Sequence, residues 1–149
     1  SFAKNLPFLN NPVWEKKLGK NKTWRGVLIA TLTGGLIFWL QKLAYVKGFT
    51  YLAVIDYSGF SIVFGFLMGF GAIFGDLVES YYKRKANIPP GKPWIPFDQL
   101  DFVIGALVLS FFIYVPPANI VLIFLVASPI LHVLFNRIGY WLGIQKNKL

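Results

Sequence analysis

Long apolar runs alternate with short polar stretches along the chain, and this pattern predicts a helical membrane protein. The first span is expected at residues 24–46, whose centre, residues 26–40, carries no charge. With its ends, this run reaches the roughly 20 residues needed to cross about 30 Å of bilayer. Thr23 directly precedes it and is suited to cap the helix. A second span is expected at residues 59–82.

The second half of the chain predicts two further spans after a long connection. Residues 83–100 are polar and rich in proline, which prevents a continuous helix there. A short third span is expected at residues 101–115 and a fourth at residues 118–134, with a kink at Pro129. We therefore expect an all-α integral membrane protein of about four spans, with residues 1–149 forming a single transmembrane domain.

Both ends of the chain are predicted to be interfacial. Residues 1–22 are polar and basic, are broken by prolines and carry aromatic side chains, and a helical turn is expected at residues 14–18. Residues 135–142 are expected to continue the last span as an interfacial helix. The chain begins with Ser1 rather than methionine, so we expect a preceding segment to be missing.

Composition supports this prediction and narrows the chemistry. Apolar residues make up 56% of the chain and charged residues only 14%, against roughly 25% charged residues in a soluble domain. There is no cysteine, which excludes disulfides and thiolate metal sites. The single histidine, His132, excludes multi-histidine metal sites and disfavours a serine–histidine triad. In an apolar helix it is expected to be a packing or interfacial residue.

Positive charge is distributed unequally between the two predicted membrane faces. Thirteen of the fifteen basic residues lie in the segment up to Arg25, in the loop after the second span and in the tail, while the opposite loops hold only Lys42 and Lys47. By the positive-inside rule the basic face is cytoplasmic, and the plasma membrane is the expected location. The net charge of +9 favours an anionic partner, a phosphate headgroup or a nucleotide rather than nucleic acid.

Ionisable residues gather where the second span ends. Glu79 and Lys83 are four residues apart, so an ion pair that supports the helix end would explain both. It does not explain Asp76, which lies deeper in the span, where an ionisable residue is a functional candidate. Spacing places four polar residues on one face of this helix: Asp76, Glu79, Ser80 and Lys83.

Two further acids, Asp98 and Asp101, are three residues apart at the start of the third span. Acids near a helix N-terminus are favoured by the helix dipole, which would explain one of them. Two acids on one face repel each other unless a cation lies between them. With Asp76 nearby, three carboxylates on two helix ends would form an oxygen-rich site suited to Mg²⁺.

Basic residues surround these acids on the same predicted face. Carboxylates that hold Mg²⁺ among lysines and arginines are what phosphoryl or nucleotidyl transfer requires, because the metal and the cations neutralise phosphate oxygens. A solvated cytoplasmic surface would explain scattered lysines about as well, but not their coincidence with three acids at membrane depth. The basic residues concerned are Lys20, Lys22, Arg25, Lys83 and Arg84.

The second span also carries glycines in two small-xxx-small pairs, Gly65 with Gly69 and Gly71 with Gly75. Close helix packing explains the first three. For Gly75, which directly precedes Asp76, close approach of the backbone to a ligand is an equal alternative.

Taken together, these residues resemble the signature of the CTP-dependent phosphatidate cytidylyltransferases. That signature is Ser-x-x-Lys-Arg, here beginning at Ser80, followed after a Pro/Gly-containing loop by Asp-x-x-Asp, here Asp98 to Asp101. Residues 93–102, Pro-Trp-Ile-Pro-Phe-Asp-Gln-Leu-Asp-Phe, are most similar to the CDP-archaeol synthase branch. Residues 20–26, with their Lys-Thr-Trp-x-Gly core, resemble a second motif of the family, and the similarity covers nearly the whole chain.

The resemblance implies an integral membrane enzyme. It would use CTP and Mg²⁺ to convert a lipid phosphate, of the archaeal diether type or an analogue, into a CDP-lipid and pyrophosphate. By motif, Asp76, Asp98 and Asp101 would be the metal carboxylates, and Lys83 would join them in catalysis. A second copy of the chain, as a homodimer, is a compatible partner. The residues expected to contact CTP or the lipid phosphate are Lys20, Lys22, Thr23, Arg25, Glu79, Ser80, Arg84 and Lys92.

The chain departs from the diacylglycerol branch, which has Asp-Arg-x-Asp and a Gly-His-Gly-Gly segment. Here Gln99 replaces the arginine and no such segment occurs. The archaeol-type branch tends to have one more span before the Lys-Thr-Trp motif, so an N-terminal span is expected to be missing. Three alternatives stay open: a phosphatidate cytidylyltransferase, a CTP-dependent polyprenol or dolichol-type lipid kinase, and a small cation-conducting or assembly subunit of the membrane.

Overall fold

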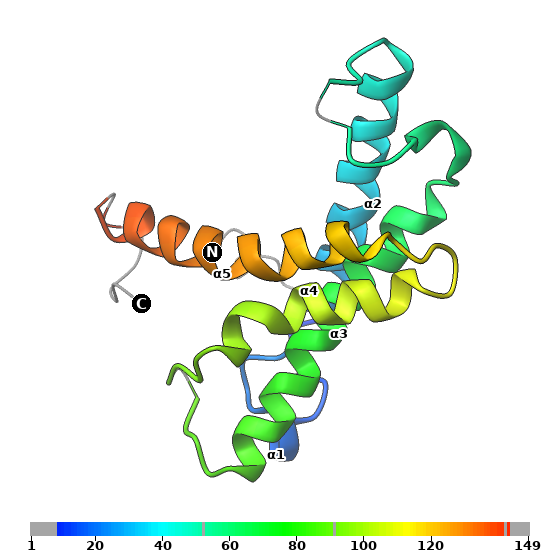
Figure 1. Cartoon of the computed structure of the whole chain (residues 1–149). Helices are drawn as coiled ribbons and strands as arrows, with labels where there is room; N and C mark the ends of the chain where they lie inside the picture. Colours follow the sequence, from blue (N-terminus) through cyan, green and yellow to red (C-terminus); the bar gives the residue numbers. More distant parts are fainter. Residues whose placement is uncertain (1–8, 52, 91, 142, 144–149) are drawn as a thin grey trace.

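The computed structural model describes residues 9–51, 53–90, 92–141 and 143, and within them every helix-or-strand element is a helix (Figure 1). The prediction of an all-helical membrane protein is confirmed, whereas the count of four spans is not. In the described residues, three helices are long and apolar enough to cross a membrane: α2 (Trp24–Val46), α3 (Val63–Lys85) and α5 (Ala118–Trp141).

Helix α4 (Phe97–Ser110) differs most from the predicted spans. It has 14 residues and is displaced towards the N-terminus relative to the expected 101–115. At 1.5 Å per residue it is about 21 Å long, which falls short of a bilayer core of about 30 Å. It begins directly after its N-cap residue, Pro96. It ends at Ser110, and residues 111–113 form a turn before Pro116.

Other boundaries follow the local sequence closely. Helix α2 has the predicted bounds, and the Thr23 side chain accepts a hydrogen bond from the Gly26 backbone N–H at 3.3 Å, as expected of an N-cap. Helix α3 runs three residues beyond its expected end. Helix α5 continues through Pro129 to Trp141, so the predicted interfacial extension is part of the same helix as far as it is described.

Two short elements complete the described chain. Helix α1 (Glu15–Leu18) is the helical turn expected near Trp14. The 3-10 turn η2 (Tyr57–Gly59) precedes α3, and Asp56 caps it by accepting from the Ser58 hydroxyl and backbone N–H. These hydrogen bonds hold the pKa of the Asp56 carboxyl below its ordinary value, and Asp56 is therefore a structural acid.

Glycines set the distances between the helices. Helices α2 and α3 cross where a Cβ on Gly34 would lie 2.6 Å from the Cα of Gly69. Helices α3 and α4 cross where a Cβ on Gly71 would lie 2.7 Å from the carbonyl oxygen of Gly105. One turn further along α3, Gly75 packs directly on the backbone carbonyl of Asp101. The sequence left helix packing and close approach to a ligand as alternatives for Gly75. In the structure this glycine packs on helix α4, so helix packing explains it too.

Apolar side chains are mostly exposed and several charged side chains are buried, which is the reverse of a soluble domain. Among the described residues only Phe38, Phe64 and Leu107 are buried large apolar side chains, while most others of this kind are exposed on the helix surfaces. The buried set instead includes charged side chains, Glu79 and Lys83 among them. A surface of apolar groups around a polar interior is what a lipid environment selects.

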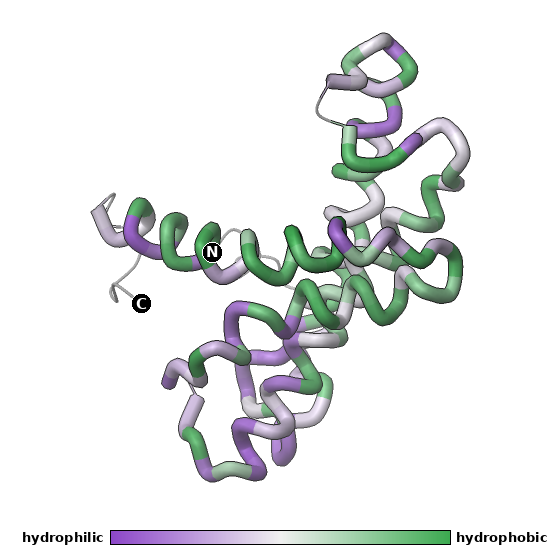
Figure 2. Tube along the Cα trace, in the orientation of Figure 1, coloured by the Kyte–Doolittle hydropathy of each residue, from purple (hydrophilic) through white to green (hydrophobic). Residues whose placement is uncertain are grey.

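The polar part of the molecule is concentrated at one end. Figure 2 shows hydrophilic residues around α1 and the C-terminal end of α3, with apolar residues along most of the remaining helices. The amino-terminal segment folds back here, because Val13 N–H donates to the Lys22 carbonyl at 2.8 Å and Arg25 N–H to the Leu9 carbonyl at 2.9 Å. Residues 1–8 of the expected interfacial segment, and Leu142, Lys146 and Lys148 of the tail, lie outside the described residues.

Candidate active site

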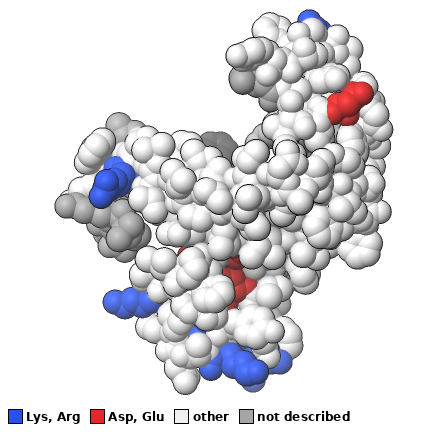
Figure 3. Space-filling view, viewed as in Figure 1, with Lys and Arg blue, Asp and Glu red and all other residues white. Residues whose placement is uncertain are grey.

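The last three turns of α3 supply most of the candidate site. The predicted face of Asp76, Glu79, Ser80 and Lys83 lines a single cavity, about 360 Å³ in volume, at the polar end of the molecule. Glu79, Ser80 and Lys83 are buried. In Figure 3, acidic atoms lie in a recess in the lower half of the molecule, with lysine and arginine side chains along its lower edge.

Helix α4 brings the second pair of acids to the same cavity. Both Asp98 and Asp101 line it, as expected from their spacing of three on the first turns of a helix. Their position depends on the contact of Gly75 with the Asp101 carbonyl, which brings the two helix backbones together beside Asp76. The predicted convergence of acids from two helix ends is therefore present in the structure.

The acids that lie closest together are not the three expected to bind metal. Asp76, Glu79 and Asp101 each offer a carboxylate oxygen, and these oxygens lie within 4.8 Å of one another. Asp98 is not one of these three, although it lines the same cavity. Its carboxylate accepts from the Lys83 ammonium group and from the Trp94 backbone N–H, the latter at 2.7 Å. Glu79 takes the place in the cluster that the sequence analysis gave to Asp98.

Three carboxylates at this separation fit a hard divalent cation. Such ions prefer carboxylate oxygens, and the cluster offers no sulfur or imidazole ligand. Glu79 Oε1 is buried and lies 3.1 Å from Lys83 Nζ, but without hydrogen-bond geometry. A buried carboxylate oxygen with only an ion-pair contact retains capacity for a further ligand.

Lysines from two parts of the chain balance these acids. Lys83 lies between Glu79 and Asp98 and pairs with both. Lys22, which precedes helix α2, places its ammonium group 2.6 and 2.7 Å from the two oxygens of Asp76. The fold of the amino-terminal segment along residues 22–25 thus delivers a cation to an acid 54 positions away.

The remaining predicted site residues are more dispersed. Arg84 lines the cavity, and its Nε and Nη1 atoms are buried without a hydrogen-bond partner among the described residues, so they are available to an anion. Lys20 is mostly exposed and pairs with Glu15 at 3.6 Å. Lys92 is exposed at the rim of a neighbouring cavity. Arg25 is buried, and the Thr23 hydroxyl is engaged as the cap of α2.

A second, apolar cavity adjoins the acids between α3 and α4. It has a volume of about 470 Å³ and also reaches Glu79 and Asp101. Its other walls are almost entirely apolar and include Phe74, Val78, Tyr82 and Phe97, all of which are exposed on the outer surface. An apolar group can therefore lie in this cavity while its polar end reaches the carboxylates.

Some residues that line the acidic cavity were not predicted as site residues, and His132 is the ionisable one among them. His132 on α5 lines both this cavity and its neighbour. A sequence signal did exist, because Ser128, His132 and Asn136 are spaced by four and form one polar stripe on an apolar helix.

Comparison with known proteins connects this arrangement to one family. A family model described as CarS-like, CDP-archaeol synthase, matches residues 12–148. A CDP-archaeol synthase of Pyrococcus furiosus is 36% identical over 124 residues, which cover 82% of this chain and 69% of the relative. The corresponding protein of Thermococcus kodakarensis is 35% identical over 143 residues, or 92% and 78% of the two chains.

A third relative, a CDP-archaeol synthase of Methanocaldococcus jannaschii, is 35% identical over 131 residues, which cover 86% of this chain and 73% of the relative. No solved structure matches the chain. The match to the family model includes the helices that carry the acids, because it extends from residue 12 to residue 148.

Proposed function

The chain belongs to the CDP-archaeol synthase family of CTP-dependent lipid cytidylyltransferases, and from this premise we propose the chemistry of its site. The substrates are CTP and an archaeal-type diether glycerol phosphate, and the products are a CDP-lipid and pyrophosphate. The observation that carries this proposal is the cluster of carboxylates from α3 and α4, surrounded by cations and adjoined by an apolar cavity.

The carboxylates of Asp76, Glu79 and Asp101 would hold a divalent ion, with Asp98 close enough to join them through the shared cavity. We assign Mg²⁺, because oxygen-only sites that act on nucleotide phosphates suit this ion. When bound, it would neutralise phosphate oxygens and hold the triphosphate in a reactive orientation.

The cations of the chain bind the phosphate groups. Lys22 and Lys83 each carry an ammonium group at the edge of the acidic cluster, and Arg84 offers unpartnered guanidinium nitrogens to the same cavity. Charge-assisted hydrogen bonds from these groups would neutralise the charge that develops on the leaving pyrophosphate. Lys20, Thr23, Arg25, Ser80 and Lys92 are proposed as further contacts around the pocket.

The reaction needs no nucleophile from the protein. A phosphate monoester is already an anion at neutral pH, so an oxygen of the lipid phosphate attacks the α-phosphorus of CTP directly. The new phosphorus–oxygen bond forms as the bond to the β-phosphate oxygen breaks, and pyrophosphate leaves with that oxygen. The role of the chain is to align the two phosphates and to balance their charge.

The apolar cavity between α3 and α4 suits the lipid substrate. Its walls face outward from the helix pair, and it reaches Asp101 and Glu79 at its inner end. A lipid phosphate can therefore approach from the bilayer with its chains against Phe74 and Val78. This location also supports a single catalytic domain, because α3 and α4 contribute both the acids and the lipid-facing wall.

We propose that the site faces the cytoplasm across the plasma membrane. Most of the basic residues gather at the polar end of the molecule, and Lys42 and Lys47 lie at the opposite end of α2. The positive-inside rule then puts the carboxylates on the side that holds CTP. A homodimer is compatible with this arrangement.

Activity of carboxylate variants tests the proposal. Purified protein is incubated with CTP labelled in its α-phosphate, Mg²⁺ and a diether glycerol phosphate, and CDP-lipid and pyrophosphate are measured. We expect Asp101→Asn, Asp98→Asn and Glu79→Gln each to lower turnover by at least about 100-fold, because each removes a carboxylate that is proposed to hold the divalent ion. Asp56→Asn, which changes a structural acid in the opposite loop, should retain turnover. Near-normal turnover in the three site variants, or release of CDP in place of pyrophosphate, would contradict the proposal.

A further inference from the structure

Helix α5 presents a polar stripe to the rest of the molecule. Ser128, His132 and Asn136 follow one another at intervals of four residues and therefore lie on one face of the helix. The Ser128 hydroxyl is buried and donates to the Gln99 carbonyl oxygen of α4 at 2.7 Å. This hydrogen bond fixes the rotation of α5, so the next two residues of the stripe are directed towards the site.

The side chain of His132 has an unused polar atom. Asn136 Nδ2 lies 3.4 Å from His132 Nε2, and an amide nitrogen can only donate, so Nε2 is the acceptor. In the tautomer that fits this contact, the Nδ1 atom carries a proton. This atom is buried and has no hydrogen-bond partner within the described part of the chain. A buried N–H donor without an acceptor is costly, and a ligand would relieve that cost.

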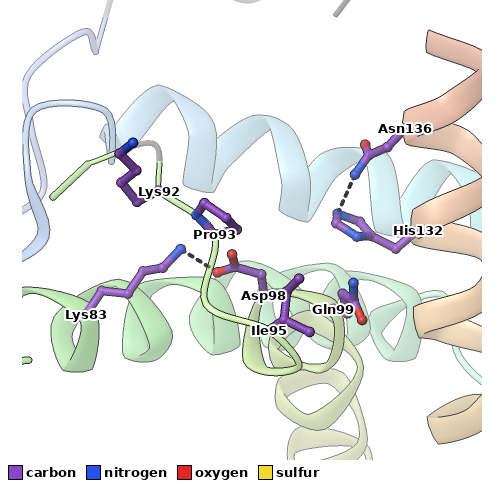
Figure 4. Close-up of a pocket in the computed structure, with 8 residues that line it drawn as sticks. All are labelled: Lys83, Lys92, Pro93, Ile95, Asp98, Gln99, His132 and Asn136. Atoms are coloured by element: carbon purple, nitrogen blue, oxygen red, sulfur yellow. Dashed lines mark hydrogen bonds and ion pairs between the residues drawn. The ribbon is translucent and has the colours of Figure 1, made fainter. Parts of the chain in front are cut away.

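A cavity separates α5 from the loop before α4 (Figure 4). Its volume is about 220 Å³, and Figure 4 shows His132 and Asn136 on one side of it, opposite Pro93 and Lys92. Gln99 contributes a buried amide. The cavity shares Lys83, Asp98 and His132 with the acidic cavity, so the two are adjacent compartments of one site.

Three compartments with different chemistry therefore meet at the carboxylates. The cavity between α3 and α4 is apolar, and the central one holds acids and cations. The one beside α5 adds two amides and an imidazole, those of Gln99, Asn136 and His132, to charged and apolar residues. A lipid phosphate that attacks CTP presents the same sequence of groups: alkyl chains, phosphates, then ribose and base. The order of the compartments matches the order of groups in the reacting pair.

We propose that the cavity beside α5 binds the cytidine half of CTP, and that His132 and Asn136 determine nucleotide specificity by hydrogen bonding to it. This inference rests on the proposed function, since it takes CTP as the substrate. Neutral donors and acceptors suit the edge of a cytosine base, whereas an apolar chain there would leave them unpaired. Pro93 and Ile95 supply apolar wall area against which a flat ring can lie.

Direct nucleotide binding, measured separately from turnover, tests this assignment. Binding of CTP and of UTP to the purified full chain is measured by equilibrium dialysis for the unchanged protein, His132→Ala and Asn136→Ala. We expect each variant to bind CTP about 10-fold more weakly, from the loss of a hydrogen bond in a buried site, and to lose most of its preference for CTP over UTP. Asn119→Ala removes an exposed amide from the first turn of the same helix and should change neither quantity.

Steady-state kinetics add a readout that a purely structural role would not change. The KM for CTP should rise in His132→Ala and Asn136→Ala while the KM for the lipid phosphate stays within about twofold, because only one substrate meets α5. His132→Gln restores a neutral hydrogen-bonding group and should recover part of the affinity for CTP. It also gives a folded reference if the alanine variant is unstable.

The outcomes separate this inference from the proposed function. If the unchanged protein binds CTP but makes no CDP-lipid, the proposed function fails, and the binding measurements still decide the role of α5. If the unchanged protein is active but the α5 variants keep their CTP affinity and their preference over UTP, the inference is overturned. In that case a lowered thermal midpoint in the same variants would show that His132 and Asn136 only hold α5 in place. If the unchanged protein binds no CTP, both proposals are overturned.

Discussion

Lys83 joins two acids that belong to different helices. It contacts Glu79 one turn earlier on α3 and Asp98 on the first turn of α4, and only 11% of its side chain is exposed. An ammonium group between two largely buried carboxylates cancels most of their mutual repulsion. The same group is also placed to bind a phosphate. Lys83 thus serves both the packing of α3 against α4 and the proposed chemistry.

Replacing Lys83 should separate these two roles. We expect Lys83→Met to lower the free energy of unfolding by about 3 kcal/mol, because two largely buried carboxylates lose their shared cation. Adding Asp98→Asn to this variant should restore part of the stability, since one of the uncompensated charges is then removed. Chemical denaturation in detergent micelles measures both effects. Neither variant should recover turnover, and equal stability of the single and double variants would show that Lys83 and Asp98 are not coupled.

The crossing of α3 and α4 controls where the acids meet. Gly75 has no side chain between its backbone and the Asp101 carbonyl, so Asp76 and Asp101 can share one cavity. The obstruction that a side chain would meet here is helix backbone, which cannot rotate away as the end of a flexible side chain can. Helix separation at this position therefore determines the separation of the carboxylates.

A single methyl group at Gly75 should accordingly disrupt the site. We expect Gly75→Ala to push α4 away from α3, to lower the thermal midpoint and to reduce turnover by at least about 100-fold, because small displacements of aligned groups are costly in catalysis. Gly59→Ala is the matched control, since nothing lies within 4 Å of the added Cβ there. Retention of turnover in Gly75→Ala would mean that the acids do not need this helix contact.

The bounds of α2 could be predicted from the sequence because strong local signals mark them. A capping threonine precedes it, and Lys47 and Gly48 follow it. The bounds of α4 could not, because hydropathy continues from residue 101 to residue 115, whereas the helix runs from Phe97 to Ser110. Apolar character determines where lipid can lie, whereas backbone hydrogen bonding determines where a helix stops.

The acidic cluster, too, could be predicted from the sequence only in part. Sequence spacing placed Asp76 and Glu79 on one helix face and Asp98 and Asp101 on another, and both pairs reach the cavity. Three of the four carboxylates lie close together. Their identity depends on how α3 and α4 cross and on which acid pairs with Lys83. Neither the helix crossing nor the partner of Lys83 can be predicted from the local sequence. The role of His132 depends likewise on the docking of α5 against Gln99.

The molecule has distinct polar and apolar regions. In Figure 1, α5 projects away from the other helices, and it packs chiefly against α4. Its surface is almost entirely exposed and apolar, as is much of α2. Exposed apolar helices belong in lipid, and the cavity with its lysines belongs at the water boundary. The proposed site therefore lies where a soluble nucleotide and a membrane lipid can both reach it.

Cysteine labelling tests the proposed orientation without background, because this chain contains no cysteine. Lys85→Cys places an exposed thiol at the end of α3 beside the site, and Lys47→Cys places one at the far end of α2. A membrane-impermeant maleimide should label the first variant only in inside-out vesicles and the second only in intact cells. Labelling of both positions from the same side, or the reverse pattern, would contradict a cytoplasmic site.

The ion pairs within the cavity also bear on what the protein needs in order to fold. Lys22 and Lys83 already supply counter-charges to Asp76, Glu79 and Asp98, so the polypeptide itself offsets much of the negative charge in the cavity. Folding of the protein would then not require a divalent ion, in contrast to zinc fingers, which unfold without their metal. We expect a chelator to halt turnover and leave the melting temperature in place, with full recovery on returning the ion. The enzyme would bind a new metal ion together with each nucleotide and would not retain the ion between turnovers.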